Sequence, residues 1–175
     1  MLTQLRIKNF RCFDEHSLSF RKNTVIVGRN NAGKSTVIEA LKLVSLVSNR
    51  HRYLNPIRVP KEANVPLHTA LSPSLQHLDL KFDTAAHGLG QLPSVIEAEF
   101  DSGETIQVYV GADHKLYGAL QRPSGSRVIT KGEAGQLGIR TIQILPQVAP
   151  LERTEMRLSS LMNLTSISIL ICSTN

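Results

Sequence analysis

The segment from residue 28 to residue 36 constrains the fold more than any other part of the chain. Two glycines stand five positions apart and are followed by a lysine and two hydroxyl residues, in the pattern GxxxxGK[ST]. This is the pattern of a P-loop, which is expected between a buried strand and a helix. The segment consists of Gly28, Arg29, Asn30, Asn31, Ala32, Gly33, Lys34, Ser35 and Thr36.

The sequence on both sides of this segment fits that context. Residues 24–27 are continuously apolar or β-branched, which predicts a short strand buried on both faces. Residues 34–48 have helical periodicity. Their apolar face consists of Val37, Ala40, Leu41, Val44 and Val47.

The residue types of the motif suit the binding of a nucleoside triphosphate with Mg²⁺. Gly28 and Gly33 let the backbone curl closely around oxygen atoms, and the start of the helix points N–H groups at phosphates. We expect Lys34 to meet the β- and γ-phosphates, Ser35 to ligate Mg²⁺ and Thr36 to reach the α-phosphate. The alternative is a glycine turn that caps a helix and binds no ligand.

Outside the motif the chain predicts mainly strands. The first lies within residues 2–10, a second at 17–20, and later ones at 75–82, 94–100, 105–110, 115–120, 127–130 and 139–145. Short turns around Gly103 and Gly125 predict two hairpins. Residues 49–74 contain four prolines and little periodicity, which predicts a long mobile loop. We divide the chain into a P-loop core (1–49), this loop (50–74), an antiparallel β-subdomain (75–150) and a tail (151–175).

Charge and composition narrow the functional classes. Residues 1–58 carry 11 basic and 3 acidic residues, whereas the rest of the chain is slightly acidic. This excess suits either the bound nucleotide and solvent or, alternatively, a DNA surface. The sequence has no secretory signal and no apolar run long enough for a membrane span. Two isolated cysteines and six scattered histidines predict a reducing, cytoplasmic setting and no zinc site.

The first strand and the P-loop together resemble a known family. Leu5, Ile7, Asn9, Phe10, Arg11 and Phe13 match the pattern L-x-I-x-N-F-(R/K)-x-F, and the P-loop follows after a short gap. Residues 1–48 thus resemble the N-terminal half of SMC/RecF-like ABC ATPases, especially OLD-type (overcoming lysogenization defect) ATPases. The resemblance implies an α/β P-loop NTPase fold, the N-terminal lobe of an ABC/SMC-type head with an antiparallel β-subdomain. It also implies ATP hydrolysis in DNA repair or anti-phage defence.

Two further site residues are implied by the resemblance. Residues 142–147 resemble the strand that leads to the Q-loop, which would put Gln147 near Mg²⁺ and the attacking water. An ordinary turn before Pro150 is the alternative. Arg11 corresponds to a position that the family brings towards the nucleotide, and a simple surface arginine is the alternative.

The family's signature motif, its Walker B carboxylates and a late histidine have no counterpart in this sequence. The final apolar run, residues 167–172, is followed by Ser173, Thr174 and Asn175, none of which is acidic. We therefore expect an incomplete head from a truncated, split or frame-shifted gene, with little hydrolysis by this chain alone. Its partner would be a second copy or a complementing ATPase or nuclease polypeptide. The alternatives are a nucleotide-binding regulatory module without turnover, an ABC transporter ATPase and a small P-loop kinase.

Overall fold

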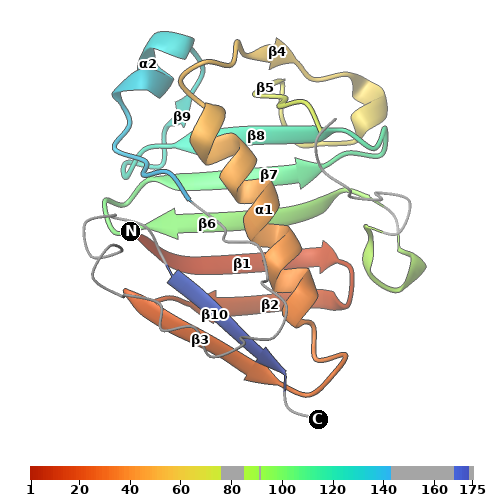
Figure 1. The fold of residues 1–175 in the computed structure, drawn as a ribbon. Coiled ribbons are helices and arrows are strands. Elements are labelled where there is room, and N and C mark those ends of the chain that lie inside the picture. The colour runs from red at the N-terminus through yellow and green to blue at the C-terminus, as the bar shows by residue number, and fades with distance from the viewer. Residues whose placement is uncertain (76–84, 91, 143–167, 174–175) are drawn as a thin grey trace.

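The central feature of the fold is a six-stranded antiparallel sheet with one long helix across its face (Figure 1). The computed structural model describes residues 1–75, 85–90, 92–142 and 168–173. The strand order is β2-β1-β6-β7-β8-β9. The strands are β1 (Leu2–Phe10), β2 (Phe13–Ser19), β6 (Ser94–Phe100), β7 (Thr105–Val110), β8 (Leu116–Gln121) and β9 (Arg127–Val128).

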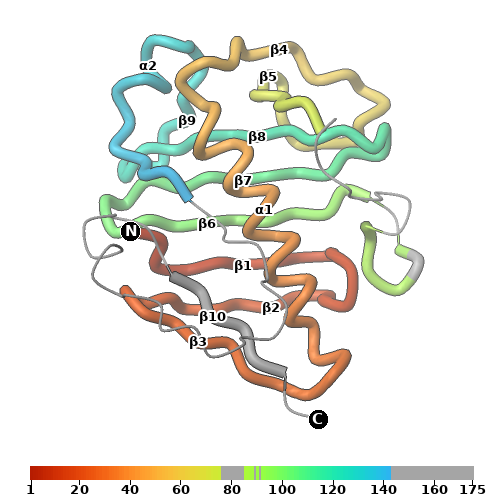
Figure 2. Tube along the Cα trace, in the orientation of Figure 1, coloured from red at the N-terminus to blue at the C-terminus, as the bar shows by residue number. Residues whose placement is uncertain are grey.

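This sheet joins segments that are far apart in the sequence. β1 lies next to the edge strand β2, between β2 and β6, and pairs Ile7 with Ile96. The predicted hairpin of residues 94–110 is confirmed, with Ala98 opposite Ile106. The sheet therefore takes strands from the segment before the P-loop and from the segment after it, as the colours of Figure 2 show.

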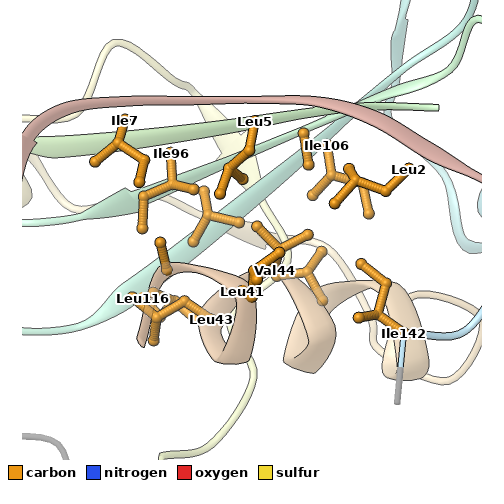
Figure 3. Close-up of a cluster of buried hydrophobic side chains, with 14 of the residues drawn as sticks. Leu2, Leu5, Ile7, Leu41, Leu43, Val44, Ile96, Ile106, Leu116 and Ile142 are labelled. Atoms are coloured by element: carbon orange, nitrogen blue, oxygen red, sulfur yellow. The ribbon is translucent and has the colours of Figure 1, made fainter. Parts of the chain in front are cut away.

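The helix α1 (Lys34–Arg50) buries its apolar side on the sheet. All five residues that helical periodicity assigned to the apolar face are buried. Leu41 and Val44 meet Leu5 and Ile106 from the strands, as Figure 3 shows. Each fully buried leucine or valine contributes roughly 1.5–3 kcal/mol through removal from water, so this interface is the main source of stability.

The P-loop strand is not buried on both faces, and that prediction was wrong. β3 (Asn23–Gly28) has alternating exposure, and the side chains of Val25 and Val27 are 57% and 59% exposed. β3 lies outside the large sheet and, among the described residues, pairs only with β10 (Ser168–Ser173). The two strands are parallel, with Val25 opposite Leu170 and Gly28 opposite Ser173. A continuously apolar sequence predicted burial, but no described element covers these two valines.

Residues 50–74 contain more structure than the predicted loop. β4 (Ile57–Arg58) pairs with β5 (Thr69–Ala70), and a 3₁₀ turn, η1 (Lys61–Ala63), lies between them. Apolar residues of this segment pack on Tyr109 and Tyr117, on β7 and β8. These contacts are tertiary, so the lack of local periodicity gave no indication of them.

The region after β8 differs from its prediction in two ways. The strand expected at 127–130 stops at Val128, because Thr130 caps a short helix, α2 (Lys131–Gln136), that was not predicted. Thr130 and Glu133 form a capping box, a signal that the sequence displays as T-x-x-E. The strand expected at 139–145 is also wrong over its described part, because residues 139–142 form no strand. Ile139 and Ile142 are nevertheless buried in the main core.

Two further predicted strands need comment, because one begins earlier than expected and the other lies almost wholly outside the described residues. β2 begins at Phe13, earlier than the expected residue 17. The strand expected at 75–82 lies outside the described residues from position 76 onward. A second 3₁₀ turn, η2 (His87–Leu89), contacts the end of β1 through the bond from the His87 backbone N–H to Asn9 Oδ1, 3.1 Å.

Candidate nucleotide-binding site

The loop between β3 and α1 has the curled backbone that a phosphate cradle needs. Asn31 and Gly33 both have positive φ values, 68° and 84°, and Gly33 is the residue that caps α1. The Ala32 N–H donates to the Arg29 carbonyl at 3.2 Å, which closes the loop. Left-handed backbone at these positions is easiest for glycine and asparagine, so the sequence of the motif and its shape agree.

The start of α1 favours an anion. No acidic residue lies in its first turn, and the side chains of Asn30, Asn31 and Ser35 are exposed. The first N–H groups of a helix have no partner within the helix, and the helix dipole adds about half a positive charge there. A phosphate group at this end would satisfy both.

Lys34 is folded over the mouth of the loop. Its Nζ donates to the Gly28 carbonyl at 2.6 Å and to the Arg29 carbonyl at 2.7 Å. These bonds fix the ammonium group between the end of β3 and the start of α1. An ammonium group has three N–H donors, so these two bonds leave one donor for a further acceptor.

The turn between β1 and β2 packs against the cradle. Cys12 Sγ lies 3.2 Å from the hydroxyl oxygen of Thr36, and the ring of Phe13 lies on Gly33. A Cβ atom at position 33 would collide with Phe13 and lie 3.0 Å from Cys12 Sγ, so only glycine fits there. The sequence reasoning missed the roles of Cys12 and Phe13, although Phe13 belongs to the recognised strand motif.

Arg11 lies beside α1 rather than over the loop. Its Nε donates to Glu39 Oε2 at 2.9 Å, and its guanidinium carbon lies 5.8 Å from the centre of the Phe10 ring. The side chain is only 19% exposed. Its backbone has a φ of 54° and is held by His87, whose Nδ1 is 3.0 Å from the Arg11 carbonyl oxygen. The structure therefore brings Arg11 close to the P-loop helix and gives it a carboxylate partner.

The other predicted site residues divide into two groups. The structure brings Gly28, Asn30, Asn31, Ala32, Gly33, Lys34, Ser35 and Thr36 together as one loop and helix start. Gln147 lies outside the described residues. Within the described part of the chain, no group of three or more His, Cys, Asp or Glu side chains could hold a metal ion. The Ser35 hydroxyl is exposed at the start of α1.

No helix in the described residues is long and apolar enough to cross a membrane.

Two known proteins are similar to parts of this chain. The OLD nuclease of Thermus scotoductus is 39% identical over 62 residues, which are 35% of this chain and 11% of that protein. The structure of the recombination mediator protein RecF with ATP, from the RecFOR pathway, is also similar, at 17% identity and a TM-score of 0.46. That alignment covers 76% of this chain and 29% of the RecF chain. The chain thus spans only a small part of the length of either relative.

A match to a family model shows which family this chain belongs to. The model for the AAA ATPase domain matches residues 1–160, which is most of the chain and includes the strand motif, the P-loop and the antiparallel strands. The predicted P-loop ATPase fold and the resemblance to OLD-type ATPases are confirmed. The chain belongs to the AAA ATPase domain family.

Proposed function

We propose that this chain binds ATP together with Mg²⁺ as the N-terminal part of an ATPase of the DNA-repair or anti-phage-defence type. The observation that carries the proposal is the position of Lys34, fixed over the loop at the anion-favouring start of α1. Family membership supports nucleotide binding, and the resemblance to OLD-type ATPases is the ground for the repair or defence context. The isolated cysteines are consistent with a reducing, cytoplasmic location.

In this proposal each residue of the loop has a separate task. The backbone N–H groups of residues 30–34 surround the β-phosphate, and Lys34 turns from the loop carbonyls to the β- and γ-phosphate oxygens. Ser35 holds Mg²⁺, which neutralises phosphate charge when it is bound. Thr36 contacts the α-phosphate. Arg11 would reach the nucleotide only by exchanging its Glu39 partner for a phosphate, and Gln147 is proposed for the water side of the site.

The test is ATP binding, measured by calorimetry with Mg²⁺ present. Lys34→Ala removes the charge-assisted bonds to phosphate, so affinity should fall about 10- to 100-fold. Lys42→Ala is the matched control, because Lys42 is exposed on α1 away from the loop and should be neutral. Equal affinity of the wild type and the Lys34 variant would refute the assignment of the P-loop.

DNA is proposed as a further partner because of the basic N-terminal third. Arg6, Lys8 and Arg11 are already paired with carboxylates and do not count towards a DNA surface. Within residues 1–58, the basic residues that are exposed and form no salt bridge with a described residue are Arg21, Lys22, Arg29, Lys42, Arg52 and Arg58.

Duplex DNA binding, followed by a mobility shift, should weaken steeply with salt because each phosphate contact releases counterions. The absence of any shift at low salt would assign the charge to the nucleotide and solvent.

A further inference from the structure

The contacts of Thr36 indicate the direction in which the nucleoside of a bound nucleotide extends from the cradle. The Thr36 hydroxyl is the proposed contact of the α-phosphate, which carries the ribose and the base. That hydroxyl lies 3.2 Å from Cys12 Sγ, in the turn between β1 and β2. The nucleoside of a bound nucleotide would therefore extend along the start of β2.

An aromatic pair lies at this place. The ring of Phe13 packs by its edge on Gly33, and its face is stacked on the ring of His16. The ring centroids are 4.6 Å apart and the planes differ by 10°. His16 is opposite Ile7 in the register of β1 and β2. Opposite residues share a face of an antiparallel pair, so His16 is on the side of the sheet that carries α1. β2 is the edge strand, and His16 is exposed there.

Other aromatic residues in the described part of the chain cannot serve this site. Five of them are buried in the two cores: Phe10, Phe20, Phe100, Tyr109 and Tyr117. Tyr53 is 77% exposed, but it follows the C-terminal end of α1. A helix of this length separates its two ends by about 25 Å. Among the described residues, Phe13 and His16 thus form an aromatic pair beside the P-loop. The His87 ring is also near this turn, but its Nδ1 is held at the Arg11 carbonyl oxygen.

We propose that Phe13 and His16 form the nucleobase platform of this site and favour purine over pyrimidine nucleoside triphosphates. The imidazole ring of His16 stacks on the base, and Phe13 holds that ring parallel by stacking behind it. A purine presents a larger π-face than a pyrimidine, so it gains more from the contact. This proposal rests on the proposed function of the P-loop.

The test separates the base from the phosphates. Affinities for ATP, UTP and inorganic tripolyphosphate are measured by calorimetry with Mg²⁺, for the wild type and for His16→Ala and His16→Phe. Stacking of a base on an aromatic side chain corresponds to roughly 5- to 100-fold in affinity. We expect His16→Ala to lose ATP affinity by this factor and to keep its tripolyphosphate affinity, and His16→Phe to restore ATP binding. His68→Ala, which removes an exposed histidine from the segment beyond α1, should change none of the three.

The outcomes distinguish the two proposals. If Lys34→Ala abolishes ATP binding but His16→Ala leaves it unchanged, the platform is refuted and the P-loop stands. Equal loss of ATP and tripolyphosphate affinity in His16→Ala also refutes the platform, because it shows an effect on the phosphates. If the wild type binds neither ligand, both proposals fall.

Discussion

At the scale of single residues, the P-loop shows how closely sequence and chemistry correspond. The pattern predicted which residues form the loop, because glycine and asparagine are the residues that adopt its left-handed backbone. It could not predict that Phe13 covers Gly33 or that Arg11 pairs with Glu39, since these contacts join residues about 20–30 positions apart. Local pattern therefore predicted the cradle, and only the fold shows what surrounds it.

Ser35 is expected to act on the metal-dependent part of nucleotide binding. Its hydroxyl is exposed at the start of α1, where it can replace one water in the shell of Mg²⁺. Ser35→Ala should weaken ATP binding on the order of tenfold with Mg²⁺ present and leave binding in EDTA unchanged. Calorimetry in both conditions checks this, with Ser45→Ala in the same helix as the control. A defect of equal size in EDTA would contradict a role in metal binding.

His51 should make stability depend on pH. It is buried at the end of α1, its Nδ1 lies 2.6 Å from the Ser48 carbonyl oxygen, and its Nε2 has no partner among the described residues. Burial lowers the pKa of His51 below 6.5, with a smaller contribution from the Arg52 charge, while the Ser48 carbonyl acts the other way. As the pH falls, His51 is therefore protonated in the unfolded chain before it is protonated in the folded chain. The contribution of neutral His51 is complete above pH 6.5 and is lost as the pH falls through the lower, folded pKa.

Urea unfolding at about pH 7.5 and about pH 5.5 measures this effect. The wild type should lose more of its free energy of unfolding on acidification than His51→Leu does. His68→Ala, which removes an exposed histidine, should follow the wild type. Parallel losses in the wild type and His51→Leu would mean that other groups control the acid sensitivity.

At the scale of elements, the sequence predicted helices and strands that have strong local periodicity. It did not predict contacts between segments that are far apart in the chain. The helix after the P-loop and the hairpin of residues 94–110 were predicted because each pattern is complete within its own segment. The exposure of β3 and the packing of residues 57–70 depend on distant neighbours, so no local pattern encodes them. α2 was missed although its capping box is local, because a helix of six residues shows too little periodicity.

Asn49 joins α1 to the segment that follows α2. Its Nδ2 donates to the Ile142 carbonyl at 3.1 Å, and its Oδ1 accepts from the Ile142 N–H, also at 3.1 Å. The Asn49 side chain thus makes the two backbone hydrogen bonds of Ile142 that a neighbouring strand would otherwise make, and it holds Ile142 in the core. Asn49→Ala should lower the free energy of unfolding by about 1–3 kcal/mol, because both hydrogen bonds to Ile142 are lost together.

Urea unfolding checks this change, and Asn55→Ala, in the exposed loop after α1, is the matched control. Asn49→Asp should also destabilise, since its carboxylate cannot donate to the Ile142 carbonyl. Stability equal to the wild type in both Asn49 variants would show that core packing alone holds residue 142.

At the scale of the whole molecule, the large antiparallel sheet and the P-loop strand are separate units of pairing. The sheet has a covering helix and a continuous core, whereas β3 pairs with β10 in a two-stranded parallel sheet. The sequence predicted a strand at residues 24–27 that is buried on both faces, whereas Val25 and Val27 are exposed.

The position of β10 bears on catalysis by this chain. Its last residue, Ser173, is opposite Gly28, where the phosphate cradle begins. A carboxylate following such a strand would be close to the phosphates, but the sequence there continues with Thr174 and Asn175. Hydrolysis requires a group that orients or deprotonates the attacking water and groups that stabilise the transition-state charge. In the proposed function Lys34 and Ser35 serve binding, and residues 28–36 contain no carboxylate that could act on the water.

We therefore expect the purified chain to bind ATP and to hydrolyse it far more slowly than about 1 s⁻¹, the low end of ordinary enzymatic turnover. A phosphate-release assay on the purified chain measures this, and Lys34→Ala supplies the background rate. Ser173 ends β10 opposite the cradle. Ser173→Asp and Thr174→Glu, alone and together, should therefore raise the rate of hydrolysis if a carboxylate at this place is the one feature that hydrolysis lacks. Activity that appears only after addition of a second polypeptide with an acidic strand end would support a divided active site. Turnover near 1 s⁻¹ by the wild-type chain alone would show that a catalytic carboxylate already exists within it.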